Sequence, residues 1–239
     1  MSACAGAPGV TTILGFDTAL GACSAAVVEW SAGGARIRAR IFELRARGHA
    51  EALAPMIDAV LAEAGMSFTD LDRLAVTVGP GSFTGLRVGI ATARGLALAA
   101  VLPVVGVTTL EAVAANVPAQ EAAARGGRIV AVLDARRGEL YVQVFGPGLA
   151  SLAGPCLVTV DDAATLVPTK GAVAVGSGAA LLAARAPGLA ISNASGEPDA
   201  AVIAVLAATR SAESLPPEPL YLRTPDAKLP RRLGVERQQ

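Results

Sequence analysis

The chain has 239 residues, of which 53% are hydrophobic and 17% charged, and its 20 Lys and Arg balance 20 Asp and Glu. This composition excludes a mainly disordered chain. The length is enough to form a hydrophobic core that needs no disulfide bonds or bound metal ions for stability. The zero net charge argues against a protein that holds a phosphate backbone unaided, because that affinity depends on clustered Lys and Arg.

Four elements are predicted in the first part of the chain. Residues 11–17, 22–30 and 35–43 are typical of three strands joined by tight, glycine-bearing turns. Residues 49–64 carry apolar side chains at helical spacing and stop before Gly65, a common residue at the C-terminus of a helix. The pattern predicts three strands followed by an amphipathic helix.

A glycine-rich string follows the next predicted strand. Residues 74–78 are typical of a buried strand, and they run into Gly-Pro-Gly-Ser-Phe-Thr-Gly at 79–85. Ser82 within this string can cap a helix that extends to about residue 100. A short strand at 103–107 then leads into a further helix.

The second half repeats the opening pattern. A buried strand at 129–134 ends in a turn, Asp134 to Gly138, with the same spacing as Asp17 to Gly21. Later, a strand at 173–175 enters Gly-Ser-Gly and an Ala-rich helix, as the strand at 74–78 enters Gly-Pro-Gly and its helix. Two matched elements in the same order predict an internal duplication.

The duplication predicts an α/β protein with two related lobes. We assign residues 1–105 to an N-terminal lobe and residues 106–215 to a smaller C-terminal lobe. The last helix, at about 198–210, is expected to cross back over the joint. Residues 216–239 lack an amphipathic period and are expected to form an extended tail.

Cysteine usage and hydropathy predict a cytoplasmic protein. Cys4, Cys23 and Cys156 are too few and too scattered for a disulfide framework or a paired zinc site. The longest apolar run, residues 95–107, is interrupted by Pro103 and is too short to span a membrane. We therefore expect no membrane association, no metal site and no cofactor.

The two matched turns allow two interpretations. A strand that ends in Asp and folds into a glycine turn can present backbone N–H groups to a phosphate, while the carboxylate holds a metal ion. Asp17 and Asp134 would then face each other across a nucleotide cleft. The alternative is a pair of turn aspartates that bond their own backbone.

The string at 79–85 also leaves two interpretations open. It is neither a Walker loop nor a G-x-G-x-x-G fingerprint, yet the N-terminus of a helix attracts anions. The string therefore serves either for anion or partner contact, or as a tight turn and capped helix packed closely on the sheet. The candidate residues are Gly79, Gly81, Ser82, Thr84 and Gly85.

Other chemistry finds little support. Ser82 lacks the G-x-S-x-G elbow, and the only histidine, His49, lies at a predicted helix start. A serine hydrolase is therefore disfavoured. Arg136 and Arg137 occupy the second turn, where a phosphate would favour glycine, and this argues against a kinase.

Several strings together resemble the TsaB family, also called YeaZ. The most specific is Val-Gly-Pro-Gly-Ser-Phe-Thr-Gly-Leu-Arg-Val-Gly-Ile at 78–90. Weaker matches are Ile-Leu-Gly-Phe-Asp-Thr at 13–18, His49 with the helix that follows it, Asp-Ala-Arg-x-Gly-Glu at 134–139 and Pro-Leu-Tyr-Leu-Arg at 219–223. The resemblance spans nearly the whole chain in the right order.

The resemblance implies two related lobes of the actin-like, Hsp70-like ATPase fold. It also implies a non-catalytic subunit that binds and supports TsaD in threonylcarbamoyl transfer to the adenosine beside the anticodon of tRNA. The TsaE ATPase joins that complex, and tRNA is contacted indirectly through it. The alternative is an active actin-fold ATPase or phosphotransferase that uses Asp17 and Asp134.

One segment supports the non-catalytic role. TsaD-like relatives carry two metal-binding histidines in the segment after the short central strand. The corresponding stretch here reads Thr-Leu-Glu-Ala-Val at 109–113, so both ligand positions are occupied by Thr109 and Val113. Without an imidazole for a divalent metal, the transfer chemistry lacks its electrophile.

The resemblance also implies a partner surface on the first two helices, at about 49–64 and 82–100. Small residues allow close approach of helices, and apolar residues supply contact area. The candidates are Met56, Val60, Val88, Ala91, Gly95 and Leu96. They either meet TsaD or face the chain's own sheet, and an unpaired patch of this kind also allows a homodimer.

Overall fold

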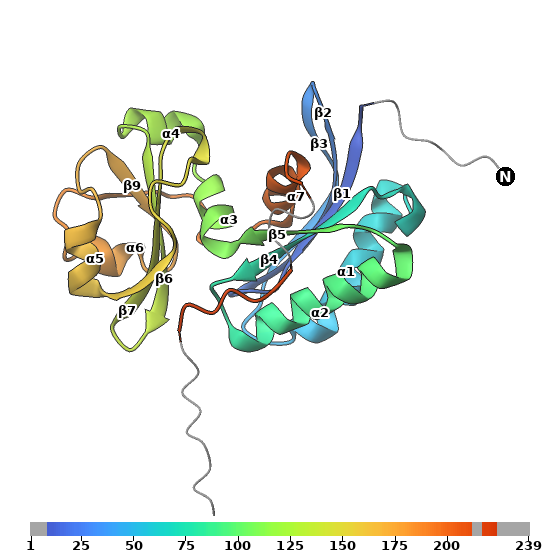
Figure 1. Ribbon diagram of the computed structural model, residues 1–239, viewed down its shortest axis with the longest axis horizontal. Helices are drawn as coiled ribbons and strands as arrows, with labels where there is room; N and C mark the ends of the chain where they lie inside the picture. The colour runs from blue at the N-terminus through green and yellow to red at the C-terminus, as the bar shows by residue number, and fades with distance from the viewer. Residues whose placement is uncertain (1–8, 212–216, 224–239) are drawn as a thin grey trace, which may run out of the picture.

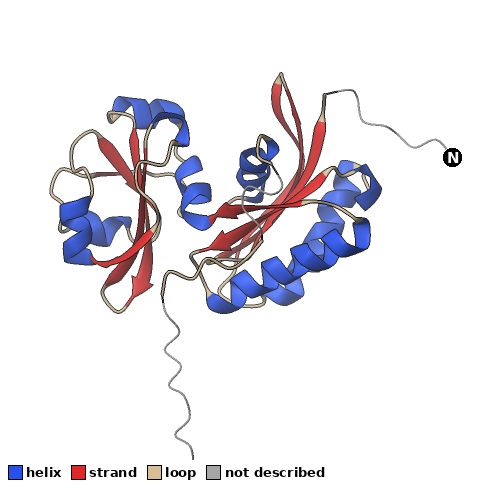
Figure 2. Ribbon diagram, in the orientation of Figure 1, coloured by secondary structure: helices blue, strands red, loops and turns tan. Residues whose placement is uncertain are grey.

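The computed structural model describes residues 9–211 and 217–223 of the chain. Within these ranges, two five-stranded sheets lie in two separate lobes (Figures 1 and 2). Helices cover both faces of each sheet. This arrangement confirms the predicted class, an α/β protein with two related lobes of the actin-like fold.

The first sheet has the spatial order β3-β2-β1-β4-β5. Strands β1 to β3 are antiparallel neighbours, whereas β4 and β5 run parallel to β1. The five strands are β1 (Thr11–Asp17), β2 (Ala22–Ser31), β3 (Gly34–Leu44), β4 (Arg73–Gly79) and β5 (Val104–Thr108).

Three helices pack on the first sheet. Helices α1 (His49–Ala64) and α2 (Phe83–Ala100) cover one face, where Leu14 and Phe16 point, and α7 (Ala200–Ala208) covers the other, where Ile13 points. Successive side chains of a strand alternate between the two faces, which explains why an apolar run such as β1 is buried throughout. We call this sheet with α1, α2 and α7 the first lobe. A short 3-10 turn, η1 (Phe68–Asp70), precedes β4.

The second sheet repeats the same topology. Read from the matching edge, its order is β8-β7-β6-β9-β10, with β6, β7 and β8 antiparallel and β9 and β10 parallel to β6. The predicted internal duplication is thus confirmed. The strands are β6 (Arg128–Arg136), β7 (Glu139–Phe145), β8 (Cys156–Thr159), β9 (Ala172–Val175) and β10 (Ala190–Ile191).

The helices of the second lobe are short. One face of the sheet carries α5 (Val160–Leu166) and α6 (Ala179–Ala183), and the other carries α3 (Thr109–Ala115) and α4 (Ala119–Ala124). A 3-10 turn, η2 (Pro147–Leu149), lies beside α3. We call this sheet with α3 to α6 the second lobe.

The two lobes exchange a helix. Helix α3 follows β5 in the chain but packs on the second sheet, and α7 follows β10 but packs on the first. Helix α7 thus lies on the first sheet although it follows the last strand of the second. Both helices lie between the two sheets in Figure 1.

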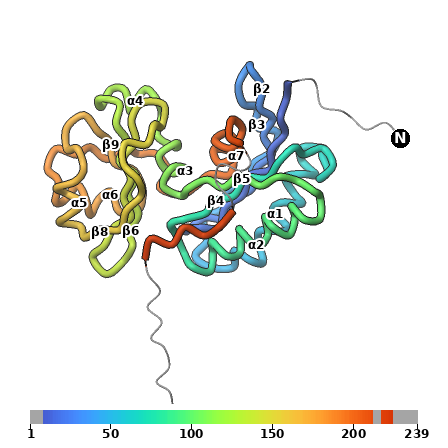
Figure 3. Tube along the Cα trace, viewed as in Figure 1, coloured from blue at the N-terminus to red at the C-terminus, as the bar shows by residue number. Residues whose placement is uncertain are grey.

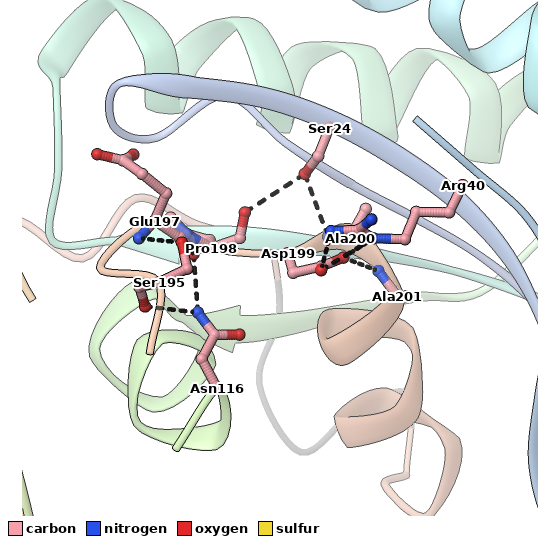
Figure 4. Close-up of polar contacts among 9 residues, drawn as sticks. All are labelled: Ser24, Arg40, Asn116, Ser195, Glu197, Pro198, Asp199, Ala200 and Ala201. Carbon is pink, nitrogen blue, oxygen red and sulfur yellow. Dashed lines mark hydrogen bonds and ion pairs between the residues drawn. The ribbon is translucent and has the colours of Figure 1, made fainter. Parts of the chain in front are cut away.

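Polar contacts fix the segment that leads into α7 (Figure 4). The Asn116 side-chain amide, just after α3, donates to the carbonyl oxygens of Ser195 and Glu197. Asp199 caps α7 by accepting from the Ala201 N–H, and its carboxylate pairs with Arg40 on β3 at 2.6 Å. The start of α7 is thus bonded to both lobes.

The division of the chain into residues 1–105, 106–215 and 216–239 remains a prediction. Strand β5 ends at Thr108, so the first of these boundaries falls inside it. Of the predicted tail, only residues 217–223 are described, and they form neither helix nor strand; the rest lies outside the described residues.

Within residues 9–211 and 217–223, no helix combines the length and apolar character that crossing a membrane requires.

Candidate functional site

The glycine-rich string at 79–85 connects β4 to α2 and lies against the turn between β1 and β2. Ser82 caps α2, since its hydroxyl accepts from the Gly85 N–H. The Ser82 N–H donates to the Ala19 carbonyl at 2.8 Å, and the Thr18 hydroxyl donates to the Gly85 carbonyl at 2.7 Å. The string is therefore bonded directly to the turn that follows Asp17.

Glycine is required in this string because the two backbones approach closely. A Cβ atom at Gly85 would lie 2.0 Å from the Thr18 carbonyl oxygen, and one at Gly81 would lie 2.6 Å from that of Ala19. Gly79 has φ +116°, a conformation that side chains disfavour. These contacts favour the tight-turn and capped-helix interpretation of Gly79, Gly81, Ser82 and Gly85. Thr84 is exposed on the first turn of α2.

The glycine string of the second lobe also packs closely on a neighbouring backbone, but at a different place. Gly176 has φ +111°, as Gly79 has φ +116°, and a Cβ at Gly176 would lie 2.2 Å from the Val132 carbonyl oxygen on β6. The Gly178 N–H donates to that same carbonyl. The second string therefore packs on the strand before Asp134, whereas the first packs on the turn after Asp17.

Asp17 is fully buried beneath the string at 79–85. Its Oδ1 accepts from the Ala19 N–H at 3.1 Å and from the Thr77 hydroxyl, while Oδ2 has no partner among the described residues. Burial raises the pKa of Asp17 to about 7; the hydrogen bonds from Thr77 and Ala19 lower it, and the nearby Glu197 raises it. The carboxylate is therefore neither open to solvent nor fully ionised at neutral pH.

Asp134 forms the equivalent turn at a more accessible position. Its Oδ1 accepts from the Arg136 N–H at 2.8 Å, two residues on, as Asp17 does with Ala19. Its Oδ2 lies 3.1 Å from the Arg136 guanidinium. Arg136 and Arg137 have φ values of 64° and 58°. Both aspartates thus bond their own backbone, which is the second of the two interpretations given above.

A carboxylate that the sequence did not indicate lies near Asp17. Glu197, in the segment before α7, accepts from the Gly21 N–H at 2.8 Å. Burial raises the pKa of Glu197, while bonds from the Gly21 and Ala22 N–H groups and the charge of His49 lower it. Gly21 and Glu197 are 176 residues apart in the chain, so no local sequence pattern predicts this contact.

His49 and Ser82 line one cleft of about 480 Å³ between the N-termini of α1 and α2. The Nε2 atom of His49 is buried without a hydrogen-bond partner among the described residues. Ser82 bonds the backbone of its own helix. In the contacts of the described residues, no base reaches the Ser82 hydroxyl.

The segment at 109–113 forms the exchanged helix α3. Thr109 and Val113 are both fully buried, and Val113 belongs to the apolar cluster of the second lobe. Glu111 forms an ion pair with Arg210, whose guanidinium also donates to the Gly106 carbonyl. Among the described residues, no three His, Cys, Asp or Glu side chains gather in a way that would hold a metal ion.

Some residues of the partner surface predicted on α1 and α2 are buried in the chain's own core. Met56 is 5% exposed and Val60 is fully buried, because both belong to the core between α1 and the first sheet. Val88 and Leu96 are half-buried against that same core. Met56 and Val60 are thus not available to a partner, which reverses our assignment of these two residues.

Helix α2 exposes small residues together with two arginines, Arg87 and Arg94. Ala91 and Gly95 are exposed one helical turn apart, and a Cβ at Gly95 would meet nothing within 4 Å. Leu98, one turn further on, is 85% exposed, and Phe83 at the start of the helix is 55% exposed. Helix α1 exposes further small side chains, including Ala54 and Ala59, and Ala59 lines a cleft with Ile41 and Glu43 of β3.

The chain is similar to several known proteins. The family model described as "TsaD: tRNA N6-adenosine threonylcarbamoyltransferase" matches residues 41–192. The tRNA threonylcarbamoyladenosine biosynthesis protein TsaB of Escherichia coli (strain K12) is 44% identical over 129 residues, 54% of this chain and 52% of that protein. The match thus spans about half the length of that curated relative.

Two further relatives match over most of their length. An uncharacterized protein of Mycobacterium tuberculosis (strain ATCC 25618 / H37Rv) is 36% identical over 229 residues, 92% of this chain and 95% of that protein. Among solved structures, YeaZ from Pseudomonas aeruginosa is 29% identical with a TM-score of 0.73, covering 89% of this chain and 100% of that one.

Proposed function

This chain belongs to the TsaB/YeaZ family, and from that premise we propose that it is a non-catalytic subunit in tRNA threonylcarbamoyladenosine biosynthesis. In this role it binds the catalytic TsaD subunit and supports threonylcarbamoyl transfer to the adenosine beside the anticodon. The TsaE ATPase joins the complex, and tRNA is contacted through it. The proposed place of action is the cytoplasm.

The segment at 109–113 carries the proposal. Thr109 and Val113 stand where the resemblance places two metal-binding histidines, and both are fully buried. Glu111, the acidic residue between them, is neutralised by Arg210. A hydroxyl, an alkyl group and a paired carboxylate do not fit a divalent metal at this place, which supports a subunit without its own transfer chemistry.

Burial of Asp17 disfavours the ATPase alternative. An ATPase of this kind would need Asp17 and Asp134 to face a magnesium nucleotide from two sides. Asp17 is fully buried, with its Oδ1 bonded to Thr77 and the string at 79–85 packed over its turn. We therefore expect calorimetry to detect no magnesium-dependent ATP binding by the isolated chain; a micromolar site would restore the alternative.

The exposed face of α2 is the proposed contact with TsaD. Ala91 and Gly95 allow the backbone of a partner helix to approach closely, and Leu98 adds exposed apolar area beside them. Close approach between helices makes the contact sensitive to side-chain size, so an added side chain should act on binding rather than on folding.

The test is a binding titration with TsaD of the same organism. We expect Gly95→Leu to weaken the Kd at least about ten-fold, the effect of a steric cost of about 1.4 kcal/mol, because the new side chain separates the helices. Ala180→Leu, an exposed helix position on the second lobe, is the matched control and should leave the Kd unchanged. Circular dichroism should show both variants folded.

An unchanged Kd for folded Gly95→Leu would reject the α2 face as the contact. Light scattering of the isolated chain tests the alternative that the α2 face binds a second copy of this chain. If the chain alone is a dimer that Gly95→Leu converts to a monomer, and TsaD competes with it, the same face serves both partners. A dimer that Gly95→Leu leaves intact would place self-association elsewhere.

A further inference from the structure

The last described residues, 217–223, cross from the first lobe to the second. Figure 3 shows this segment in red, running below β4 toward the lower end of the second lobe. The Leu220 N–H donates to the Val78 carbonyl at 2.7 Å. A Cβ on Gly79 would lie 2.8 Å from the Leu220 carbonyl oxygen, so glycine at this position also lets the crossing segment pack on the end of β4.

Tyr221 attaches the segment to the first turn of α2. Its ring lies 5.7 Å from that of Phe83 between centroids, and its hydroxyl accepts from the Arg87 Nε at 3.2 Å. The Arg87 guanidinium in turn stacks 3.6 Å from the centre of the Phe83 ring. Such aromatic and cation–π contacts hold a partly exposed segment in a defined place.

Arg223 attaches the other end of the segment to the second lobe. Its guanidinium donates to the Ala135 carbonyl at 3.0 Å and forms an ion pair with the Glu139 carboxylate. Both acceptors flank the turn between β6 and β7. The side chains of Arg223 and Glu139 are 26% and 35% exposed, so this pair is better shielded from solvent than an ordinary surface pair.

We propose that residues 217–223 form an interlobe clasp that holds the two lobes in one orientation. The exchanged helices α3 and α7, which lie between the two sheets in Figure 1, form another connection between the lobes. A second connection at a separate place resists the rotation that a single joint permits.

This inference does not depend on the proposed function, because every contact in it lies within one chain. The clasp predicts that loss of Arg223 frees the segment and then loosens the lobes. The variants are Arg223→Ala and Glu139→Gln in the full chain. The control is Arg45→Ala, which removes a somewhat more exposed ion pair with Glu43, at 2.7 Å, that lies wholly within the first lobe.

The first readout is hydrogen exchange of the Leu220 amide. We expect Arg223→Ala to accelerate its exchange about ten-fold, the change in opening equilibrium that follows from losing charge-assisted hydrogen bonds at a partly exposed site. Glu139→Gln keeps an acceptor and should have a smaller effect in the same direction. Arg45→Ala should leave this amide unchanged.

The second readout is the distance between the lobes. Spin labels are placed at Ala62 on α1 and Ala184 after α6, both exposed, after replacement of Cys4 and Cys156 by serine; Cys23 is buried. Pulsed dipolar spectroscopy should give one narrow distance distribution for the parent chain and for Arg45→Ala. Arg223→Ala should broaden it.

Two results would overturn the clasp. The first is unchanged exchange of residues 217–223 in Arg223→Ala, which would mean that the ion pair does not hold the segment. The second is faster exchange with an unchanged distance distribution, which would mean that the segment rests on the lobes without fixing their orientation.

Discussion

The two lobes share one strand order and differ in their outer helices. In the first lobe, α1 and α2 have 16 and 18 residues, whereas their counterparts α5 and α6 in the second lobe have 7 and 5. Long helices present a continuous outer face, and short ones only cover their own sheet. The two lobes therefore share their sheet topology, and only the first has a long, continuous outer helical face.

The two Asp turns differ in the same way. Both aspartates accept from the backbone N–H two residues on, but Asp17 is sealed under the start of α2 and Asp134 is partly exposed beside Arg136. A long α2 that begins directly on the first turn closes it. The same local motif is therefore a core element in one lobe and a partly exposed turn in the other, and the start of α2 packs only on the first.

The largest expected effect is a loss of stability when a side chain is added at Gly85, where α2 packs on the β1–β2 turn. Gly85→Ala should destabilise the protein by about 3–5 kcal/mol, because a Cβ 2.0 Å from the Thr18 carbonyl forces α2 off the first turn. Urea denaturation measures this change. Gly176→Ala places a Cβ 2.2 Å from the Val132 carbonyl oxygen in the second lobe, and a loss below about 1 kcal/mol in both variants would contradict the close backbone approach at these two glycines.

The next largest effect is the stability lost when the ion pair between Arg210 and Glu111 of α3 is removed. Arg210→Ala should cost about 2–3 kcal/mol, since it leaves the mostly buried Glu111 carboxylate and the Gly106 carbonyl without this donor. Thermal and urea unfolding measure the loss. Arg185→Ala breaks a well-exposed pair with Asp161 and should change stability by less than about 0.5 kcal/mol. Equal effects of the two variants would contradict the role of Arg210 at the joint.

The Asp turns predict a pH effect on stability. Because the folded pKa of Asp17 is raised from 3.8 to about 7, the fold binds more protons than the unfolded chain between these values. The stability of the parent protein should therefore fall from about pH 4 to pH 7, by an amount on the order of 2 kcal/mol from this group. Asp17→Asn should remove that slope.

Denaturation at a series of pH values measures the difference between Asp17→Asn and the parent. Asp134→Asn, at the matching turn, is the control and should change stability at pH 8 by about 0.5 kcal/mol or less, as surface substitutions do. A slope of the same size in Asp17→Asn would show that Asp17 is not its source.

The smallest expected effect is that of Gly95→Ala on α2, which should change stability and TsaD affinity in opposite directions. Gly95→Ala should stabilise the isolated chain by about 0.5–1 kcal/mol, since the position is helical and open. The same methyl group should weaken the affinity for TsaD, so the two measurements should move in opposite directions. A gain in both would place the partner on another face.

The sequence determined the elements and their repetition, because those depend on neighbouring residues. Alternating and apolar runs predicted the strands, the spacing of the two Asp turns and two glycine strings predicted the duplication, and Ser82 was correctly assigned as the cap of α2. The helical spacing that predicted α1 already included Met56 and Val60, which lie on the face packed against the sheet. Their assignment to a partner surface came from the family resemblance, and it was wrong because that face is buried.

Tertiary structure decided everything that depends on distant segments meeting. The burial of Asp17 requires α2 to begin on the β1–β2 turn, the bond from Gly21 to Glu197 requires the last helix to return to the first lobe, and the contacts of Arg223 require residues 217–223 to reach the second. Strand and helix patterns record local preference, whereas burial, charge and pKa depend on which surfaces meet. The sequence thus determined the parts of each lobe, and only their packing closed one Asp turn and left the other accessible.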